Sequence, residues 1–254
     1  MPWIGDGLTH TGLLRSTNQD AFAVLNDRSL WLVADGMGGH PGGDVASRSA
    51  VAAIAQQAGA VRPGRLAQRI RGSQTAAQLQ TMIEGANRAI LATAEISPEL
   101  KGMGTTLVAL HIASGFRARA TVAHVGDSRA YLWREAHLLP LTRDHSLVEE
   151  YVRHGLLTPE QARTHPHRHV LSRALGIAET VEPDVSSFFL RRDDVLLLCT
   201  DGLTKMLIDE QIASVLRRAG RLPQQICEAL VEEALRSGGE DNVTVVAVCQ
   251  DPRS

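Results

Sequence analysis

The sequence predicts an α+β fold, and three observations lead to this prediction. Strand-like runs come in neighbouring pairs separated by turn-forming residues, and helix-like stretches come in pairs between groups of strands. Of the 254 residues, 44% are hydrophobic, which supports a substantial core. The sequence has no internal repeat, low-complexity tract or interdomain linker. We therefore expect one domain over residues 1–254, although two small domains would also fit the length.

The predicted strands are apolar runs bounded by turn residues. Residues 1–20 form a polar approach, and residues 21–25 and 30–34 form a hairpin around the turn-forming residues 26–29. The later predicted strands are residues 105–112, 118–125, 129–133, 185–190, 195–199 and 243–249.

The predicted helices follow from caps and from apolar spacing. Asp44 is placed to cap a first helix, and residues 79–94 carry apolar side chains at steps of three and four, which define one face of a second helix. Residues 60–75 contain Pro, Gly and several Arg, so we expect a loop there. Two more helices precede the last strand, with Pro223 in the first turn of the second. Residues 143–175 are polar, hold five of the ten histidines and are expected to form an inserted flap.

Composition narrows the class of protein. The formal net charge is −2 and only 4% of the residues are aromatic, so neither a basic field nor stacking side chains point to nucleic acid. The N-terminus lacks the basic start and apolar core of a signal peptide, and no apolar run approaches the ~18 residues that cross a bilayer. Cys199, Cys227 and Cys249 each lie in an apolar run, which predicts buried free thiols. We expect a cytoplasmic protein without a membrane partner.

Four aspartates lie at the ends of predicted strands beside glycine or another turn-forming residue: Asp35–Gly36, Gly126–Asp127, Asp201–Gly202 and Asp241–Asn242. One Asp-Gly pair is usually only a turn signal. Since antiparallel strands bring the end of one strand beside the start of the next, all four can meet at one edge of a sandwich. Clustered carboxylates repel one another unless cations neutralise them, and hard oxygen ligands suit Mg²⁺ or Mn²⁺. The pattern indicates a binuclear metal site that activates water.

Arg15 adds a second element. It lies five residues before Asp20, in the loop that enters the first predicted strand. A guanidinium group can bind a phosphate with two parallel hydrogen bonds. The alternative is a solvated surface arginine, as most arginines of this chain must be.

Eight short motifs in order resemble one known family, the metal-dependent serine/threonine protein phosphatases of the 2C type. Residues 15–20 (RSTNQD) are similar to the opening motif of that family, and residues 33–40 (VADGMGGH) are similar to its first metal motif. Later motifs match at residues 102–106, 125–129, 141–146, 171–176, 199–203 and 239–244. Each motif alone is a weak signal, but eight motifs in this order are specific to the family. The Asn-Gln-Asp and Gly-Met-Gly-Gly sequences within the first two motifs resemble the compact bacterial branch of the family.

The resemblance implies a fold and a reaction. The fold is a four-layer αββα sandwich, in which two antiparallel sheets pack face to face with helix pairs outside. The reaction is hydrolysis of phosphoserine and phosphothreonine in proteins by a hydroxide that bridges two Mn²⁺ or Mg²⁺ ions, without a phosphoenzyme. Expected partners are phosphorylated proteins, among them serine/threonine kinases and their substrates, and we expect a monomer.

The resemblance also implies roles for named residues. Asp35 would bridge the two ions, and the carbonyl of Gly36 would complete the shell of one of them. Asp201 and Asp241 would bind the other ion, and Asp127 with Asp201 would hold a third. The remaining roles are a hydrogen bond to metal-bound water for Asp20, substrate phosphate binding for Arg15 and shaping of the site for Asn242.

The sequence departs from the family pattern at one position. Some members carry a histidine directly after the Asp-Gly pair as general acid, and this chain has Met37 there. His40, three residues further on, either assists as proton donor or is a loop histidine without chemistry. The five flap histidines include a His-Pro-His-Arg-His stretch that resembles a metal-binding tract, but they are interpreted as a solvated loop that helps to dock substrate: His145, His154, His165, His167 and His169. We predict that replacing His165, His167 and His169 by alanine preserves activity on a small phosphoester.

Two other classes were weighed against this interpretation. Phosphatases that form an aspartyl phosphate need an Asp-x-Asp motif, and the residues two positions before Asp35 and Asp201 are Val33 and Cys199, so this class is excluded. The second class is a catalytically weak relative that binds phosphoproteins as a regulator. Such a relative would be expected to have lost metal-binding acids, whereas Asp35, Asp201 and Asp241 are all present here, which disfavours this class.

Overall fold

The computed structural model describes residues 2–37, 42–60, 72–115 and 117–251 and contains two antiparallel sheets. The first sheet has the order β1 (Trp3–His10), β11 (Val243–Gln250), β10 (Val195–Cys199), β7 (Arg129–Arg134) and β8 (His137–Pro140). The second has the order β2 (Asp20–Leu25), β3 (Leu30–Met37), β5 (Leu107–Ala113), β6 (Arg119–Val125) and β9 (Asp184–Phe189), with β4 (Gly104–Thr105) beside β3.

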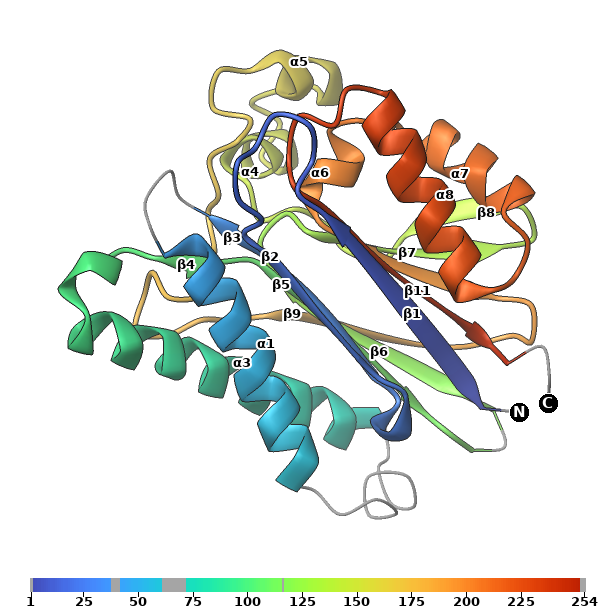
Figure 1. The fold of residues 1–254 in the computed structure, drawn as a ribbon, viewed down its shortest axis with the longest axis horizontal. Helices are drawn as coiled ribbons and strands as arrows, with labels where there is room; N and C mark the ends of the chain where they lie inside the picture. Colours follow the sequence, from blue (N-terminus) through green and yellow to red (C-terminus); the bar gives the residue numbers. More distant parts are fainter. Residues whose placement is uncertain (1, 38–41, 61–71, 116, 252–254) are drawn as a thin grey trace.

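Helices cover the outer face of each sheet (Figure 1). The helices α1 (Gly43–Ala60) and α3 (Gly72–Ile96) pack on the second sheet, and α7 (Asp209–Arg218) and α8 (Pro223–Arg236) pack on the first. Shorter elements are the helices α4 (Leu147–Arg153), α5 (Pro159–Thr164) and α6 (Asp201–Thr204), and the 3₁₀ turns η1 (Asn26–Arg28) and η2 (Pro98–Leu100). No helix of the described residues is long and apolar enough to cross a membrane.

Strand alternation produces three layers of core. On β3, Leu30 and Leu32 face the helices α1 and α3, whereas Trp31 and Val33 face the other sheet. The first sheet repeats this pattern and turns its outer side chains, such as Leu197, toward α7 and α8. Because successive side chains of a strand point to opposite faces of its sheet, they form one core between the sheets and one beneath each helix pair. The predicted αββα sandwich is confirmed.

The predicted hairpin is confirmed as β2 and β3 around η1, but the polar approach is wrong. Residues Trp3–His10 form β1, which pairs with β11 along its whole length. This stretch has no apolar run because it contains two glycines and an aspartate, so tertiary pairing rather than local propensity makes it a strand.

Other boundaries differ by a few residues. The helix α1 begins at Gly43, so Asp44 lies in its first turn, where it pairs with Arg48, rather than at the cap. The helix α3 begins at Gly72, inside the predicted loop of residues 60–75. The flap contains α4 and α5, whose caps Ser146 and Thr158 accept hydrogen bonds from backbone N–H groups. The three cysteines are free and buried, as predicted.

Candidate metal centre

The pairing of β2 and β3 places two acids side by side. Asp20 and Asp35 are cross-strand partners at the end of the hairpin. Asp35 lies inside β3, which continues to Met37, and not after the strand as predicted. Its backbone is fixed because its N–H donates to Thr106 Oγ1 at 3.0 Å and its carbonyl accepts from Thr105 Oγ1 at 2.8 Å. The main chain is thus held at a defined place next to the cavity.

Gly36 allows two segments to approach the acids closely. Its N–H donates to the carbonyl of Gln19 at 3.1 Å. A Cβ at this position would lie 2.1 Å from the Gly43 carbonyl oxygen and 2.6 Å from that of Gln19. Only glycine therefore lets the start of α1 and the end of the 15–20 loop reach the strand that carries Asp35.

The other three acids come from loops at the same end of the sandwich. Asp127 follows β6, Asp201 opens α6 directly after β10, and Asp241 precedes β11. Together with Asp35 they line one cavity of about 510 Å³. Arg15, Gly36 and Asn242 line the same cavity. The structure thus brings together all the predicted site residues that it describes, except Asp20, which lies beneath.

Asp20 is connected to this cavity through two hydroxyl groups. Its Oδ2 accepts hydrogen bonds from Thr200 Oγ1 at 2.8 Å and from Thr244 Oγ1 at 2.6 Å. Thr200 directly precedes Asp201, and the Thr244 N–H donates to Thr200 Oγ1 at 3.0 Å. The network joins β2 of one sheet to β10 and β11 of the other.

The carboxylates raise one another's proton affinity. Burial raises the pKa of Asp20 to about 7, with further increases from the charges of Asp201 and Asp241, while the bonds from the two threonines act in the opposite direction. Burial, followed by the charges of Asp201, Asp20 and Asp127, raises the pKa of Asp35 well above its ordinary value. The described residues alone therefore compensate the negative charge of these carboxylates poorly.

The donor set fits divalent cations. Among the described residues, Asp20 Oδ1 and Asp201 Oδ1 are buried oxygens without a hydrogen-bond partner. Burial and the charge of Asp201 also raise the pKa of Asp127, to about 7. Asp201, which carries one of these unpartnered oxygens, lines the cavity, and carboxylate oxygens are the hard ligands that Mg²⁺ and Mn²⁺ prefer. The residues present therefore fit such ions.

Two cations of the chain itself lie on these acids. Lys205 Nζ is 2.6 Å from Asp201 Oδ2 and 2.9 Å from Asp241 Oδ2, and Arg15 Nε is 2.9 Å from Asp241 Oδ1. Although burial alone would raise the pKa of Asp241, its hydrogen bond and ion pair with Lys205 hold it below the ordinary value. Lys205 was missed from the sequence. The available signal was its spacing of four residues after Asp201, which places both on one helix face.

Asn242 fixes the loop that carries Arg15. Its Nδ2 donates to the carbonyls of Thr11 at 2.8 Å and Thr17 at 2.9 Å, and its Oδ1 accepts from the Gln19 N–H at 2.8 Å. One side chain therefore pins three points of the segment from residue 11 to residue 19.

The histidines have different positions. His40 lies outside the described residues, whereas Met37 lines the cavity. Of the flap residues His165, His167 and His169, the last lines the cavity as well. No pattern in the sequence separates His169 from its neighbours, because only the fold of the flap brings it to the acids. The interpretation as a solvated loop is wrong for His145, which is buried.

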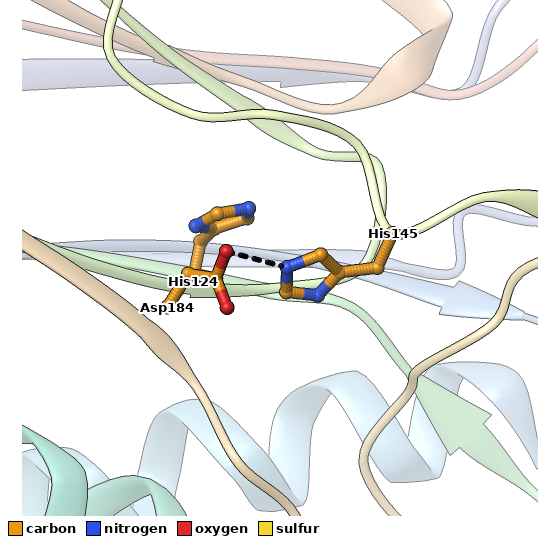
Figure 2. Close-up of side chains that lie close together, drawn as sticks. All are labelled: His124, His145 and Asp184. Carbon is orange, nitrogen blue, oxygen red and sulfur yellow. Dashed lines mark ion pairs between the residues drawn. The ribbon is translucent and has the colours of Figure 1, made fainter. Parts of the chain in front are cut away.

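A second group of possible metal ligands lies outside the cavity. His124, His145 and Asp184 approach one another, with His145 Nε2 3.4 Å from Asp184 Oδ2 (Figure 2). The imidazole rings of the two histidines are stacked with their centroids 4.4 Å apart and an angle of 29° between their planes.

The hydrogen bonds of this group also assign its protons. His124 Nε2 donates to the Arg143 carbonyl at 2.8 Å, and His145 Nδ1 accepts from the Gly126 N–H at 3.2 Å, so His145 carries its proton on the Nε2 that faces Asp184. The backbone N–H of His145 also donates to the Gly126 carbonyl at 2.9 Å. The group clamps the turn before Asp127 to the flap, and we do not assign a metal to it.

The comparison with known families agrees with the motif order. The profile of the protein phosphatase 2C family matches residues 4–236. The chain belongs to this family. The expected membership of the protein phosphatase 2C family is thereby confirmed.

Bacterial relatives cover most of the chain. It is 40% identical over 237 residues to the serine/threonine protein phosphatase PstP of Mycobacterium tuberculosis, a match that covers 92% of this chain and 42% of PstP. It is 37% identical over 246 residues to the serine/threonine phosphatase stp of Listeria monocytogenes, covering 96% and 94% of the two chains. The chain thus spans less than half the length of PstP, but nearly all of stp.

Solved structures of the family share the fold. The crystal structure of PstP from M. tuberculosis superimposes with a TM-score of 0.84 at 37% identity, covering 98% of this chain and 99% of that one. The catalytic domain of PstP in complex with two manganese ions gives a TM-score of 0.80 at 36% identity, covering 97% of both chains.

Proposed function

We propose that this chain hydrolyses phosphoserine and phosphothreonine in proteins with two Mn²⁺ or Mg²⁺ ions. Residues 1–254 act as one catalytic domain, with the flap of residues 143–175 beside the site. One observation carries the proposal: Asp35, Asp127, Asp201 and Asp241 line one cavity together with Arg15. The family supports it, as does the related PstP domain that was solved with two manganese ions.

The residues that would hold the ions are those with hard oxygen donors at the cavity. Asp35 would bridge the two ions, the Gly36 carbonyl would bind one, and Asp201 and Asp241 would bind the other. Asp127 would share a third ion with Asp201. When bound, such ions lower the pKa of water and supply hydroxide at neutral pH.

Asp20 orders the site from below. Its Oδ2 is fully engaged by Thr200 and Thr244, while its Oδ1 has no partner among the described residues. A carboxylate that is held rigidly with one free oxygen can accept a hydrogen bond from water in the cavity. We assign Asp20 to this role and not to direct metal binding.

Arg15 binds and orients the substrate phosphate. Its guanidinium lies at the mouth of the cavity and its side chain is 56% exposed, so it can exchange Asp241 for an incoming phosphate. The planar fork of donors matches phosphate oxygens and can balance the negative charge of the transferring phosphoryl group. The serine or threonine alkoxide then leaves and takes a proton from water or from His40.

A phosphoprotein-binding regulator with little activity is the alternative function. The present acids argue against it, since a binding module has no need for a cluster of mutually repelling carboxylates. Mn²⁺-dependent release of p-nitrophenol from p-nitrophenyl phosphate separates the two. Enzyme activity that EDTA and the Asp201→Asn substitution both abolish supports the phosphatase, and absence of turnover at any Mn²⁺ concentration supports the regulator.

The partners and location are proposals of the same kind. Phosphorylated proteins, including serine/threonine kinases and their substrates, are the proposed partners, and a monomer is the proposed state. The free buried thiols Cys199, Cys227 and Cys249 fit a reducing compartment such as the cytoplasm.

A further inference from the structure

Lys205 is an unusual residue in this chain. The sequence contains 24 arginines and only two lysines, Lys101 and Lys205. Lys205 lines the acidic cavity, and its side chain is 31% exposed. Its position follows from α6, because the Lys205 N–H donates to the Asp201 carbonyl at 2.7 Å, one helical turn away.

The ammonium group connects two acids that come from different parts of the chain. Nζ is 2.6 Å from Asp201 Oδ2 and 2.9 Å from Asp241 Oδ2. These are two of the carboxylates to which we assign metal ions. The same oxygens cannot donate fully to an ammonium group and to a divalent ion, because both cations compete for the same lone pairs and repel each other.

We propose that Lys205 is an internal counter-ion of the metal centre. In the absence of metal its ammonium group neutralises Asp201 and Asp241, and it leaves these acids when metal binds. Lys205 therefore weakens metal binding and stabilises the metal-free protein. This inference rests on the metal ligands assigned under the proposed function.

The chemistry of lysine suits this exchange. An ammonium group is a compact charge on a flexible four-carbon stem, so it can move toward solvent without disturbing the backbone. Partial exposure of the Lys205 side chain leaves that route open. Arg15 contacts only Asp241 of this pair, and its exposed guanidinium suits phosphate instead.

Metal binding can be measured without substrate or turnover. Calorimetric titration of Mn²⁺ into EDTA-stripped protein is compared for the wild type, Lys205→Met and Lys101→Met. Lys101 is exposed in the turn after η2, so its replacement is the matched loss of one lysine away from the acids. We expect Lys205→Met to bind Mn²⁺ at least about tenfold more tightly, because the ammonium group no longer competes for the carboxylate oxygens or repels the ion.

The thermal stability of the stripped proteins gives the second half of the test. Without this ammonium group, Lys205→Met leaves Asp201 without its lysine partner and Asp241 with Arg15 alone. Its midpoint of unfolding therefore falls below that of the wild type and of Lys101→Met, and Mn²⁺ closes the gap. An unchanged or weaker Mn²⁺ affinity in Lys205→Met overturns the counter-ion proposal alone. Failure of Mn²⁺ to bind the wild type overturns both this proposal and the metal centre itself.

Chemical labelling reports the movement of the side chain directly. Because the chain has two lysines, acetylation by an N-hydroxysuccinimide ester can be followed at each by mass spectrometry. We expect Mn²⁺ to raise the labelling rate of Lys205 severalfold while that of Lys101 stays constant. Equal labelling of Lys205 with and without Mn²⁺, under conditions where calorimetry shows binding, would contradict the displacement.

Discussion

Asp20 and Asp35 are cross-strand partners in β2 and β3, so the sheet itself holds a second carboxylate next to the one that lines the cavity. Like charges in this position are unfavourable in the absence of a cation. Burial is the largest cause of the raised pKa of both groups; the charge of Asp20 further raises the pKa of Asp35, whereas the charges of Asp201 and Asp241 further raise that of Asp20. The raised pKa values imply that the metal-free fold carries a penalty that depends on pH.

The first prediction concerns this penalty at Asp20. Its pKa rises from an ordinary value of 3.8 to about 7 in the folded protein, so the unfolded chain releases its proton first as the pH rises. Folding of the metal-free protein is therefore penalised progressively between pH 4 and pH 7, and the penalty is constant above that range. Asp20→Asn removes it and keeps an oxygen acceptor for Thr200 and Thr244.

We expect metal-stripped Asp20→Asn to match the wild type near pH 4 and to exceed its stability by roughly 4 kcal/mol above pH 7. Urea unfolding in EDTA measures this difference. The comparison with the variant is needed because burial also lowers the pKa of His111 and His145 to about 4, which changes wild-type stability in the opposite direction over the same range. A difference that does not vary with pH would contradict the prediction.

The second prediction concerns Arg15. Arg15→Lys keeps the charge but loses the planar pair of donors, so we expect kcat/KM for a phosphothreonine peptide to fall by roughly 10- to 100-fold. Arg217→Lys is a matched control, because Arg217 lies over the ring of Trp133 on the outer helix α7. Steady-state kinetics with both variants tests the role, and an equal effect of the two substitutions would argue against phosphate binding by Arg15.

The third prediction concerns Asn242, which acts through the Arg15 loop. Asn242→Ala removes the bonds to Thr11, Thr17 and Gln19, and we expect a loss of about 1–3 kcal/mol in unfolding free energy together with a higher KM. A double-mutant cycle with Arg15→Ala separates positioning from general damage. If Asn242 positions Arg15, the two effects on kcat/KM are not additive. Additive effects would mean that Asn242 acts elsewhere.

The fourth prediction concerns Gly202, which follows Asp201, one of the proposed metal ligands. A Cβ at Gly202 would lie 1.9 Å from the Asn242 carbonyl oxygen, so Gly202→Ala must displace the segment that carries Asp241. We expect a loss of roughly 3 kcal/mol in stability and weaker Mn²⁺ binding. Gly59→Ala in α1 is the control, since nothing lies within 4 Å of the added Cβ, and it should raise stability by about 0.5–1 kcal/mol. Equal behaviour of both variants would contradict the close approach.

Local sequence patterns predicted the parts of the fold that have strong local signals. The hairpin of β2 and β3 and the outer helices α3 and α8 were predictable because apolar periodicity and turn residues agree there. The strand β1 was not, because it contains glycines and an aspartate and exists through its pairing with β11. Short helices of the flap were missed because their stability comes from caps and packing rather than from a long apolar face.

The site shows the same division. Asp35, Asp201 and Asp241 stand in motifs whose spacing is visible in the sequence, and the fold brings them to one cavity. Lys205 reaches that cavity through helix geometry, for which its spacing from Asp201 was the signal, whereas His169 reaches it through the path of the flap, which no linear pattern encodes. The hydrogen bonds from Thr200 and Thr244 to Asp20 connect β2 to the residue after β10 and to β11, which are distant in sequence, so only the packed sandwich reveals them.

The most direct test of the account is hydrolysis of a phosphothreonine peptide by protein stripped of metal and then titrated with Mn²⁺. We expect no phosphate release in EDTA, recovery with two bound Mn²⁺ per chain by metal analysis, and no recovery in Asp201→Asn. Sustained hydrolysis in EDTA, or full activity of Asp201→Asn, would contradict a reaction that depends on metal held by these acids.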